Sequence, residues 1–262
     1  QNVGTATVTV TNTADGNYTF PEKEENFDIR EADAVLTSTP RAKDLTYNGT
    51  MQDLVTVGTA SGGTVVYSLA QDGSYTEAIP QEDEAGTYTV YYMVKGDDNH
   101  GDTTPRHVSV TIKPKEVISP KITVTGSYTY NGSEQKPAGN NVTVEDGSTT
   151  IPATEYTLSY QNNINAGTAM VIVINANGGN YIVNGTATFE IAKASAGAAA
   201  APAPQTLKYN GTVQELVTAG SASDGTMVYS LDQNGEYSPA LPSGKDVGNY
   251  TVWYKVKGDD NH

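Results

Sequence analysis

An internal repeat constrains this chain more than any other feature of its sequence. Residues 45–100 align without a gap with residues 207–262, and 35 of the 56 aligned positions are identical. Within this repeat, LTYNGTMQDLVTVGTASGGTVVYSL returns as LKYNGTVQELVTAGSASDGTMVYSL, and VKGDDNH returns unchanged. A different unit also recurs, because residues 166–181 (AGTAMVIVINANGGNY) align with residues 3–18 (VGTATVTVTNTADGNY). The repeats indicate an array of small modules of two types in the order A–B–A–B.

Both module types follow one backbone plan. A Tyr-Asn-Gly turn recurs at Tyr47, Tyr130 and Tyr209. In all four copies a glycine precedes an Asn-His or Asn-Tyr pair by 13 residues; these glycines are Gly4, Gly86, Gly167 and Gly248. This register predicts an array that is truncated at both ends. Its parts are the C-terminal part of an A module at 1–31, a complete B module at 32–114, a complete A module at 115–192, and a B module lacking its last strand at 193–262.

The composition favours strands and turns. Threonine and the 17 tyrosines favour strands, 26 glycines and many asparagines favour turns, and no segment has a sustained helical apolar period. The chain has no cysteine, which excludes disulfides and thiolate chemistry. Its net charge of −15 opposes binding to nucleic acid or to anionic lipid. No apolar stretch is long enough to predict membrane insertion.

Short strands between frequent turns predict a β-sandwich in each module. In the first B module we expect strands at 35–38, 45–47, 54–57, 64–69, 87–95 and 108–113. Asp72-Gly73 and Asn234-Gly235 suit type I′ hairpin turns, in which both central residues have positive φ. The Ala/Pro-rich segment 194–205 is expected to be partly extended and docked on its module.

Alternation along the longest strand predicts its two faces. The inward residues in the four copies are Ala6, Val8 and Val10; Tyr88, Val90 and Tyr92; Ala169, Val171 and Val173; and Tyr250, Val252 and Tyr254. The outward residue at the strand centre is Thr9, Tyr91, Ile172 or Trp253. In the first copy, Val8 and Val10 have no evident sheet to cover, and we expect them to be loosely held or to borrow another surface. The last B module should present an open strand edge.

The motif around the start of this strand resembles the tyrosine corner of immunoglobulin-like domains. Glu84-x-Gly86-x-Tyr88 and Asp246-x-Gly248-x-Tyr250 place a tyrosine where its hydroxyl can bond upstream backbone. Valine stands two residues later, where those domains have cysteine. The motif predicts that the ring of Tyr250 is buried and that its hydroxyl satisfies a backbone group.

Longer motifs carry a resemblance that covers essentially the whole chain. TYNGxxQxLV, YSLxxxGxYxxxxPxxxxxGxYTVYYxVKGDxN and SYTYNGSEQKP, with YQNNINAGTA and NYxVNGTATFEIAK, are similar to the tandem MBG-type and related Ig-like repeats of large Gram-positive cell-surface proteins. The resemblance implies an all-β tandem array of small immunoglobulin-like β-sandwich modules. It also implies non-catalytic spacer repeats of a secreted or wall-attached, adhesin-like protein outside the bacterial cell. The partners would be neighbouring modules, with host glycan or protein as a further class.

Three kinds of site remain as alternatives. Calcium could be held by Asp97, Asp98, His100 and Asp102, although no EF-hand spacing is present and His100 stands where A modules have an aromatic residue. Carbohydrate or protein could be bound by the outward rings of Tyr91 and Trp253, whose competing role is packing against a neighbour. The modules could also be accessories of a surface-attached hydrolase. For catalysis we predict no residues, because the only histidines are His100, His107 and His262 and no nucleophile or phosphate motif accompanies them.

Overall fold

The computed structural model describes residues 2–262, so Gln1, the first residue of the predicted 1–31 segment, lies outside the described residues. The chain divides into two compact units. They comprise residues 1–116 with 177–182, and residues 117–176 with 183–262. Among the described residues, helical structure is limited to two 3₁₀ helices of three residues each, both in the second unit. None of the helices in the described residues is long and apolar enough to cross a membrane.

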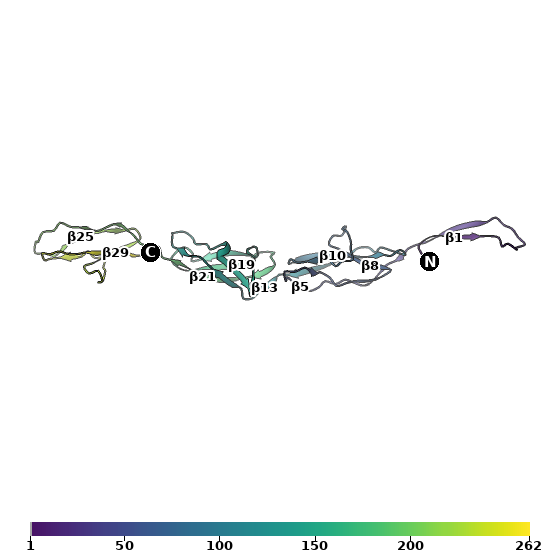
Figure 1. The fold of residues 1–262 in the computed structure, drawn as a ribbon, viewed down its shortest axis with the longest axis horizontal. Coiled ribbons are helices and arrows are strands. Elements are labelled where there is room, and N and C mark those ends of the chain that lie inside the picture. The colour runs from purple at the N-terminus through teal and green to yellow at the C-terminus, as the bar shows by residue number, and fades with distance from the viewer. Residues whose placement is uncertain (1) are drawn as a thin grey trace. The chain divides into compact units, whose positions relative to one another are not determined.

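The first unit contains a hairpin and a complete B module, drawn in purple to blue in Figure 1. The hairpin pairs β1 (Gly4–Val10) with β2 (Lys23–Ile29) in antiparallel register. The B module contains β3 (Ala32–Asp33), β4 (Val35–Ser38), β5 (Leu45–Thr46), β6 (Gln52–Asp53), β7 (Thr59–Ser61), β8 (Gly63–Ser68), β9 (Gln81–Glu82), β10 (Gly86–Gly96), β11 (His100–Gly101) and β12 (Arg106–Lys113).

The B module has the strand arrangement of an immunoglobulin-like sandwich. Its main sheet has the order β5-β12-β10-β8, in which β10 is antiparallel to both neighbours and the early strand β5 runs parallel to the last strand β12. Separate antiparallel pairs, β4–β7 and β6–β9, and the parallel pair β3–β11 complete the module. In a β-sandwich two sheets pack face to face, and each sheet buries one face in the apolar core between them.

The core confirms the predicted inward face of β10. Val90 is fully buried and Tyr92 is 5% exposed, and both pack in one cluster with Leu54, Val110 and Ile112. Tyr88 is half-buried against the same cluster. The outward Tyr91 is half-buried beside the ring of His107, with ring centroids 5.8 Å apart.

The second unit contains the A module and the last B module. The A-module elements are β13 (Lys115–Val117), β14 (Lys121–Val124), β15 (Tyr128–Thr129), η1 (Gly139–Asn141), β16 (Val142–Asp146), β17 (Thr149–Thr150), η2 (Ala153–Glu155), β18 (Tyr156–Gln161), β19 (Gly167–Asn175), β20 (Tyr181–Val183) and β21 (Gly185–Ala192), of which β13 and β20 extend across the unit boundary. The last B-module elements are β22 (Ala198–Ala200), β23 (Ala203–Pro204), β24 (Gln214–Glu215), β25 (Val217–Thr218), β26 (Ser221–Ala222), β27 (Gly225–Ser230), β28 (Ser243–Gly244) and β29 (Trp253–Gly258).

The A module repeats the plan of the B module. Its main sheet has the order β15-β21-β19-β18, again with the early strand parallel to the last strand. On β19 the inward residues Ala169, Val171 and Val173 are at most 1% exposed, as predicted. The register is also repeated, since Gly4, Gly86 and Gly167 each lie opposite an isoleucine of the last strand, at Ile29, Ile112 and Ile191. The structure therefore shows a tandem array of immunoglobulin-like modules.

The Ala/Pro-rich segment is extended and docked, as expected. β22 pairs with β26 and β23 pairs with β25, so both parts of the segment belong to the last B module. The three Tyr-Asn-Gly turns are also alike. In each, the asparagine side chain accepts a hydrogen bond from the backbone N–H two residues on, and the intervening glycine has φ of 76° or 77°.

Three sequence-based expectations are wrong. The predicted strand 54–57 is absent, because Leu54 and Val55 are buried outside the ladders and only Val55 makes an isolated bridge. The type I′ turns are absent, since neither Asp72-Gly73 nor Asn234-Gly235 has positive φ. In each case a longer loop follows the strand, so no tight hairpin demands that geometry; Gly73 and Gly235 instead donate to carbonyls three residues back.

The third correction concerns Tyr250, which is 42% exposed rather than buried. Residues 248–252 form no strand, whereas their counterparts 86–90 belong to β10. In the first B module β12 pairs with those counterparts. Within the described residues the last B module has no strand in that place.

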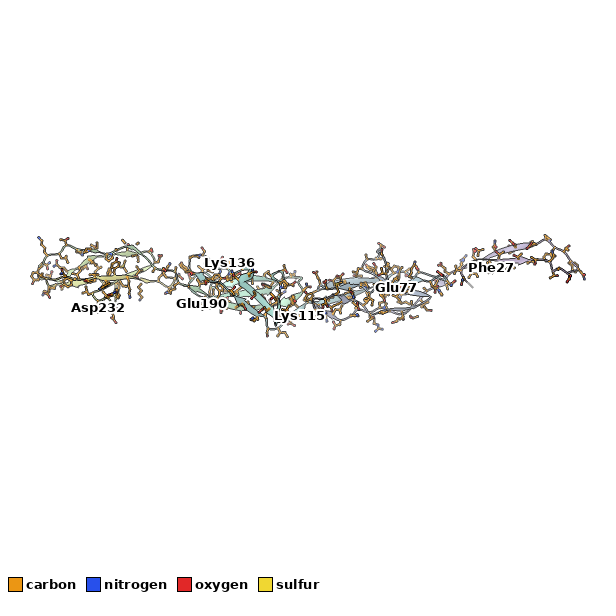
Figure 2. All side chains as sticks on the ribbon, viewed as in Figure 1. Phe27, Glu77, Lys115, Lys136, Glu190 and Asp232 are labelled. Carbon is orange, nitrogen blue, oxygen red and sulfur yellow. The ribbon has the colours of Figure 1, made fainter. Side chains whose placement is uncertain are left out.

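The hairpin near the N-terminus has an exposed apolar face. Val8 is 52% exposed, Val10 is 48% exposed, and Phe27, labelled on β2 in Figure 2, is 51% exposed. Val8 and Val10 therefore lack a covering sheet within the unit. The predicted loose hold or borrowed surface remains an expectation.

Candidate functional site: an asparagine clasp between modules

The unchanged VKGDDNH segment forms a tight turn that we call the clasp turn, Gly96–His100 in the first B module and Gly258–His262 in the last. Its first residue must be glycine, because a Cβ at Gly96 would lie 1.9 Å from the carbonyl oxygen of His100, and one at Gly258 would lie 2.1 Å from that of His262. Such approaches are impossible for any other residue type. The turn therefore depends on its glycine.

An aspartate organises each clasp turn from within. The Asp97 carboxylate accepts hydrogen bonds from the backbone N–H of Asn99 at 2.9 Å and from Nδ1 of His100 at 2.7 Å. Asp259 makes the same contacts with Asn261 at 2.8 Å and His262 at 2.8 Å. The hydrogen bond from the histidine, followed by that from the asparagine N–H, holds the pKa of both carboxyls below the usual aspartate value.

The asparagine of the turn connects one module to the one before it. In the second unit, Oδ1 of Asn261 accepts from the backbone N–H of Ala166 at 2.9 Å, and its backbone oxygen accepts from the N–H of Ala194 at 2.9 Å. Ala166 precedes β19 of the A module, and Ala194 begins the segment that joins the two modules. Nδ2 of Asn261 also reaches Oδ1 of Asn165 at 3.4 Å. A single residue thus satisfies backbone donors of two separate segments. We call this pair of hydrogen bonds the clasp.

The same clasp occurs twice in the first unit. Asn99 accepts from the N–H of Val3 at 2.9 Å through its side chain and from the N–H of Ala32 at 2.9 Å through its backbone oxygen. Asn180, in the 177–182 tip that belongs to this unit, accepts from Ala85 at 2.6 Å and from Lys115 at 2.9 Å. Each of the three N–H groups bonded by these side chains belongs to the residue immediately before the recurring glycine of its strand, which is Gly4, Gly86 or Gly167. The geometry is therefore common to B-type and A-type turns.

An aromatic ring completes the clasp. His262 packs edge-on against Tyr130, with centroids 5.2 Å apart and planes at 85°, and Tyr181 packs likewise against Tyr47 at 5.2 Å and 72°. Tyr130 and Tyr47 each belong to a Tyr-Asn-Gly turn. Edge-to-face pairs of this kind add about 0.5–1.5 kcal/mol to the burial of their area. His262 of the last B module and Tyr181 of the A module therefore make equivalent contacts.

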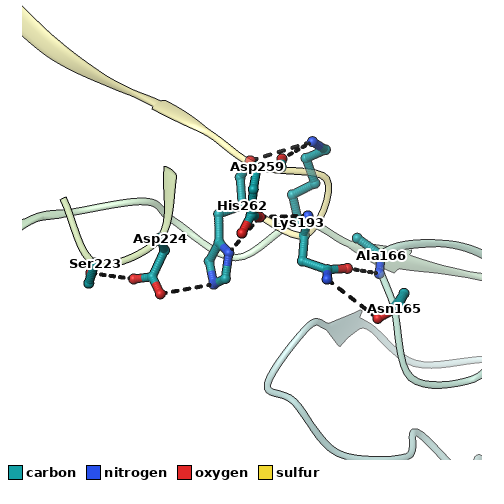
Figure 3. Close-up of polar contacts among 8 residues, drawn as sticks. Asn165, Ala166, Lys193, Ser223, Asp224, Asp259 and His262 are labelled. Atoms are coloured by element: carbon teal, nitrogen blue, oxygen red, sulfur yellow. Dashed lines mark hydrogen bonds and ion pairs between the residues drawn. The ribbon is translucent and has the colours of Figure 1, made fainter. Parts of the chain in front are cut away.

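Lys193 and Asp224 support the last clasp turn (Figure 3). Nζ of Lys193 donates to the backbone oxygen of Asp259 at 2.6 Å and approaches that of His262 at 3.4 Å. Oδ1 of Asp224 lies 3.9 Å from Nε2 of His262, while Oδ2 accepts from the hydroxyl of Ser223. The Lys193 ammonium at two carbonyls of the turn and the Asp224 carboxylate near the His262 ring both oppose opening of the turn.

The predicted calcium ligands do not converge in the structure. Asp97 is bonded within the clasp turn, Asp98 is exposed, and Asp102 bonds Nζ of Lys95 at 2.7 Å and the N–H of Gly96 at 2.9 Å. The lysine hydrogen bond and then the backbone N–H lower the pKa of Asp102. Among the described residues no group of three histidine, aspartate or glutamate side chains could hold a metal ion.

The predicted ligand-binding aromatics stand apart from the clasp. Tyr91 faces His107, and Trp253 on β29 is 38% exposed. Trp253 lies opposite Ser230 of β27, as Tyr91 lies opposite Ser68 of β8. The asparagines of the clasp were missed as site residues. The signal was present in the 13-residue spacing and in the 81 residues that separate Asn99 from Asn180 and Asn180 from Asn261.

Among known proteins, a similarity is found only with solved structures. No known protein family matches the chain, and no curated protein matches it. Among solved structures, it is similar to the chain described as Sidekick-1 immunoglobulin domains 1-5, with 12% identity and a TM-score of 0.30. The match covers 92% of this chain and 56% of that chain, so this chain spans little more than half its length.

Proposed function

We propose that the chain is a structural spacer, a run of non-catalytic repeats in a secreted or surface-attached, adhesin-like bacterial protein. The observation that supports this role most directly is the clasp itself. Three turns of two module types make the same pair of hydrogen bonds to the preceding segment. A joint of that kind limits bending between modules, which is what a spacer requires.

The chemistry of the joint allows the same joint to recur between different modules. Its hydrogen bonds are donated by backbone N–H groups. The side chains of the segment that carries these N–H groups can therefore change while the joint is retained. The donors are indeed valine in one place and alanine in two. In this proposal the modules are MBG-type repeats located outside the bacterial cell, in keeping with the sequence resemblance. Their partners are neighbouring modules of the same chain.

Small-angle X-ray scattering of the 262-residue chain tests the spacer role. We expect an elongated particle in solution. The variants Asn99→Ala, Asn180→Ala and Asn261→Ala should broaden its distribution of dimensions, because each removes one side-chain acceptor at a joint. The matched control is Asn234→Ala, in a loop turn away from the clasps. A compact particle, or identical scattering from all four variants and the unmodified chain, would overturn the proposal.

A further inference from the structure

The clasp turn of the last B module contacts the A module at two points. One is the ring of Tyr130, which packs against His262. The other is the backbone N–H of Ala166, which bonds the side chain of Asn261. We call these two points the docking points of the A module. Because His262 directly follows Asn261 in the chain, both docking points are contacted together only if they stand in one fixed relation to each other.

A single glutamine, Gln135, is bonded to the surroundings of both docking points. Its backbone N–H donates to the backbone oxygen of Asn163 at 2.6 Å, and its backbone oxygen accepts from Nδ2 of Asn163 at 3.0 Å. Asn163 precedes Ala166 by three residues. The side chain of Gln135 reaches the other way, because its Nε2 donates to Oδ1 of Asn131, the residue after Tyr130, at 2.8 Å. Gln135 therefore connects the turn that carries the ring to the loop that carries the N–H.

Asn163 holds this loop with its side chain as well as its backbone. It is buried, with 6% of its surface exposed. Its side-chain amide donates to Gln135 where a β-bridge would use a backbone N–H, so the pairing continues beyond Gln161, the last residue of β18. Asn162 has a φ of 54°, in the left-handed region that asparagine tolerates. Two hydrogen bonds to one partner therefore hold the segment that leads to Ala166.

The same connection recurs in the B modules. The glutamine of each Tyr-Asn-Gly-x-x-Gln segment pairs with the residue four positions before the recurring glycine; the pairs are Gln135 with Asn163, Gln52 with Glu82, and Gln214 with Gly244. In the B modules the glutamine Nε2 donates to the backbone oxygen of the residue before the tyrosine, from Gln52 to Thr46 at 3.2 Å and from Gln214 to Lys208 at 3.0 Å. In each of these modules one glutamine thus connects the tyrosine turn to the loop before the glycine.

We propose that Gln135 and Asn163 are positioning residues of the joint, which hold the ring of Tyr130 and the N–H of Ala166 in the relation that a clasp turn requires. The partner that fits these docking points is a turn with an asparagine followed directly by an aromatic ring or histidine. The inference rests on the proposed function, in which the clasp is a joint between modules. Each positioning residue acts through another residue, since the contacts to the turn are made by Tyr130 and Ala166.

The first test is Asn163→Asp in the intact 262-residue chain. The variant keeps the shape of the side chain but places an oxygen where Nδ2 donates to the Gln135 carbonyl. We expect amide hydrogen exchange at Ala166 to accelerate about fivefold, the equivalent of about 1 kcal/mol for one hydrogen bond, with exchange at Val171 unchanged. The matched control is Asn162→Asp, which makes the same chemical change at an exposed neighbour and should leave Ala166 exchange as it is.

A second variant, Gln135→Ala, tests the other docking point. It keeps the backbone pairing with Asn163 and removes the side-chain bond to the tyrosine turn. We expect the ring resonances of His262 to shift in nuclear magnetic resonance spectra, because the Tyr130 ring beside them moves, while Ala166 exchange stays unchanged. This variant also decides the proposal if Asn163→Asp accelerates exchange at Val171, which would mean that the A module itself has opened.

Unchanged Ala166 exchange in Asn163→Asp, or equal acceleration in Asn162→Asp, would overturn the role of Asn163. Unshifted His262 resonances in Gln135→Ala would overturn the role of Gln135. These readouts are local and separate this inference from the spacer role. An elongated particle without these local changes contradicts the positioning residues alone, and a compact particle with them contradicts the spacer alone.

Discussion

The side-chain oxygen of Asn261 accepts a hydrogen bond from the backbone N–H of Ala166 at 2.9 Å, although the two residues are 95 positions apart in the chain. Ala166 stands immediately before the glycine that starts the longest strand of its module. The bond therefore attaches the turn of one module to the strand entry of another. The backbone oxygen of Asn261 accepts from Ala194 as well, so the joining segment is held at the same point.

Replacing Asn261 with alanine should loosen this joint without unfolding either module. The variant leaves the Ala166 N–H without its acceptor, and we expect a cost of about 1 kcal/mol, as for an ordinary hydrogen bond. The measurement is amide hydrogen exchange. Exchange at Ala166 should accelerate several-fold, while exchange at the fully buried Val171 of β19 should be unchanged.

The control for this variant is Asp260→Ala, in the same turn. Asp260 is exposed, so its replacement should leave Ala166 exchange as it is in the unmodified chain. Equal acceleration in both variants would mean that the turn as a whole, and not the Asn261 side chain, protects the joint.

Two buried tyrosine hydroxyls offer a second prediction. Tyr67 and Tyr229 are 3% and 4% exposed, and their hydroxyls accept from the backbone N–H groups of Gly58 at 2.8 Å and Gly220 at 2.9 Å. Tyr67→Phe keeps the ring and removes the acceptor, so the Gly58 N–H is left unsatisfied in a buried place. We expect a loss of about 1–3 kcal/mol in the free energy of unfolding of the first B module, measured by chemical denaturation.

Tyr75→Phe is the matched control for Tyr67→Phe. The Tyr75 hydroxyl donates to the backbone oxygen of Gln71 at 2.9 Å in an exposed setting, where water can replace it. Its loss should change the free energy of unfolding by less than about 0.5 kcal/mol. A Tyr67 variant as harmless as the Tyr75 variant would show that the buried N–H of Gly58 finds another partner.

The repeat and its alternation were sufficient to predict the tandem immunoglobulin-like plan and the inward faces of β10 and β19. Val90 and Val171 are fully buried because the pleat repeats every two residues, and that period is visible in any one copy. The corner tyrosine followed from its spacing to the glycine. Its hydroxyl does bond the backbone four residues upstream, from Tyr88 to Glu84 and from Tyr250 to Asp246.

The clasp could not be predicted from those local patterns. The recurring Gly-to-Asn spacing shows that a turn is repeated, but the partner of the Asn261 side chain depends on how two modules pack. Leu54 was placed in a strand for a related reason. Apolar residues in a short run are buried in strands and in irregular segments alike, and periodicity does not separate the two.

Acid should loosen the clasp turns at their aspartates. The pKa of Asp97 and of Asp259 is lowered in the folded chain, first by the histidine hydrogen bond and then by the asparagine N–H. A lowered folded-state pKa gives stabilisation that is complete above the usual aspartate range near pH 4 and is lost as the pH falls through the folded pKa. Nuclear magnetic resonance of the Asn99 and Asn261 amides should therefore show the turns changing only below about pH 4. Asp97→Asn keeps an acceptor that does not titrate, so its Asn99 amide should be insensitive to pH in that range.

The two corner tyrosines should differ in their contribution to stability, although their hydrogen bonds are the same length. The hydroxyls of Tyr88 and Tyr250 each donate to a backbone carbonyl at 2.9 Å, yet the Tyr88 ring packs against the core and the Tyr250 ring is 42% exposed. Tyr88→Ala creates a partial cavity and should cost about 3 kcal/mol, at the low end for a large aromatic truncation. Tyr250→Ala should cost less than half as much, because water already reaches its ring. Hydrogen exchange of each module measures the two costs separately, with the exposed Thr251→Ala as a control expected to change stability by less than about 0.5 kcal/mol. Equal costs for the two tyrosines would mean that the ring of Tyr250 is packed in solution as well as the ring of Tyr88.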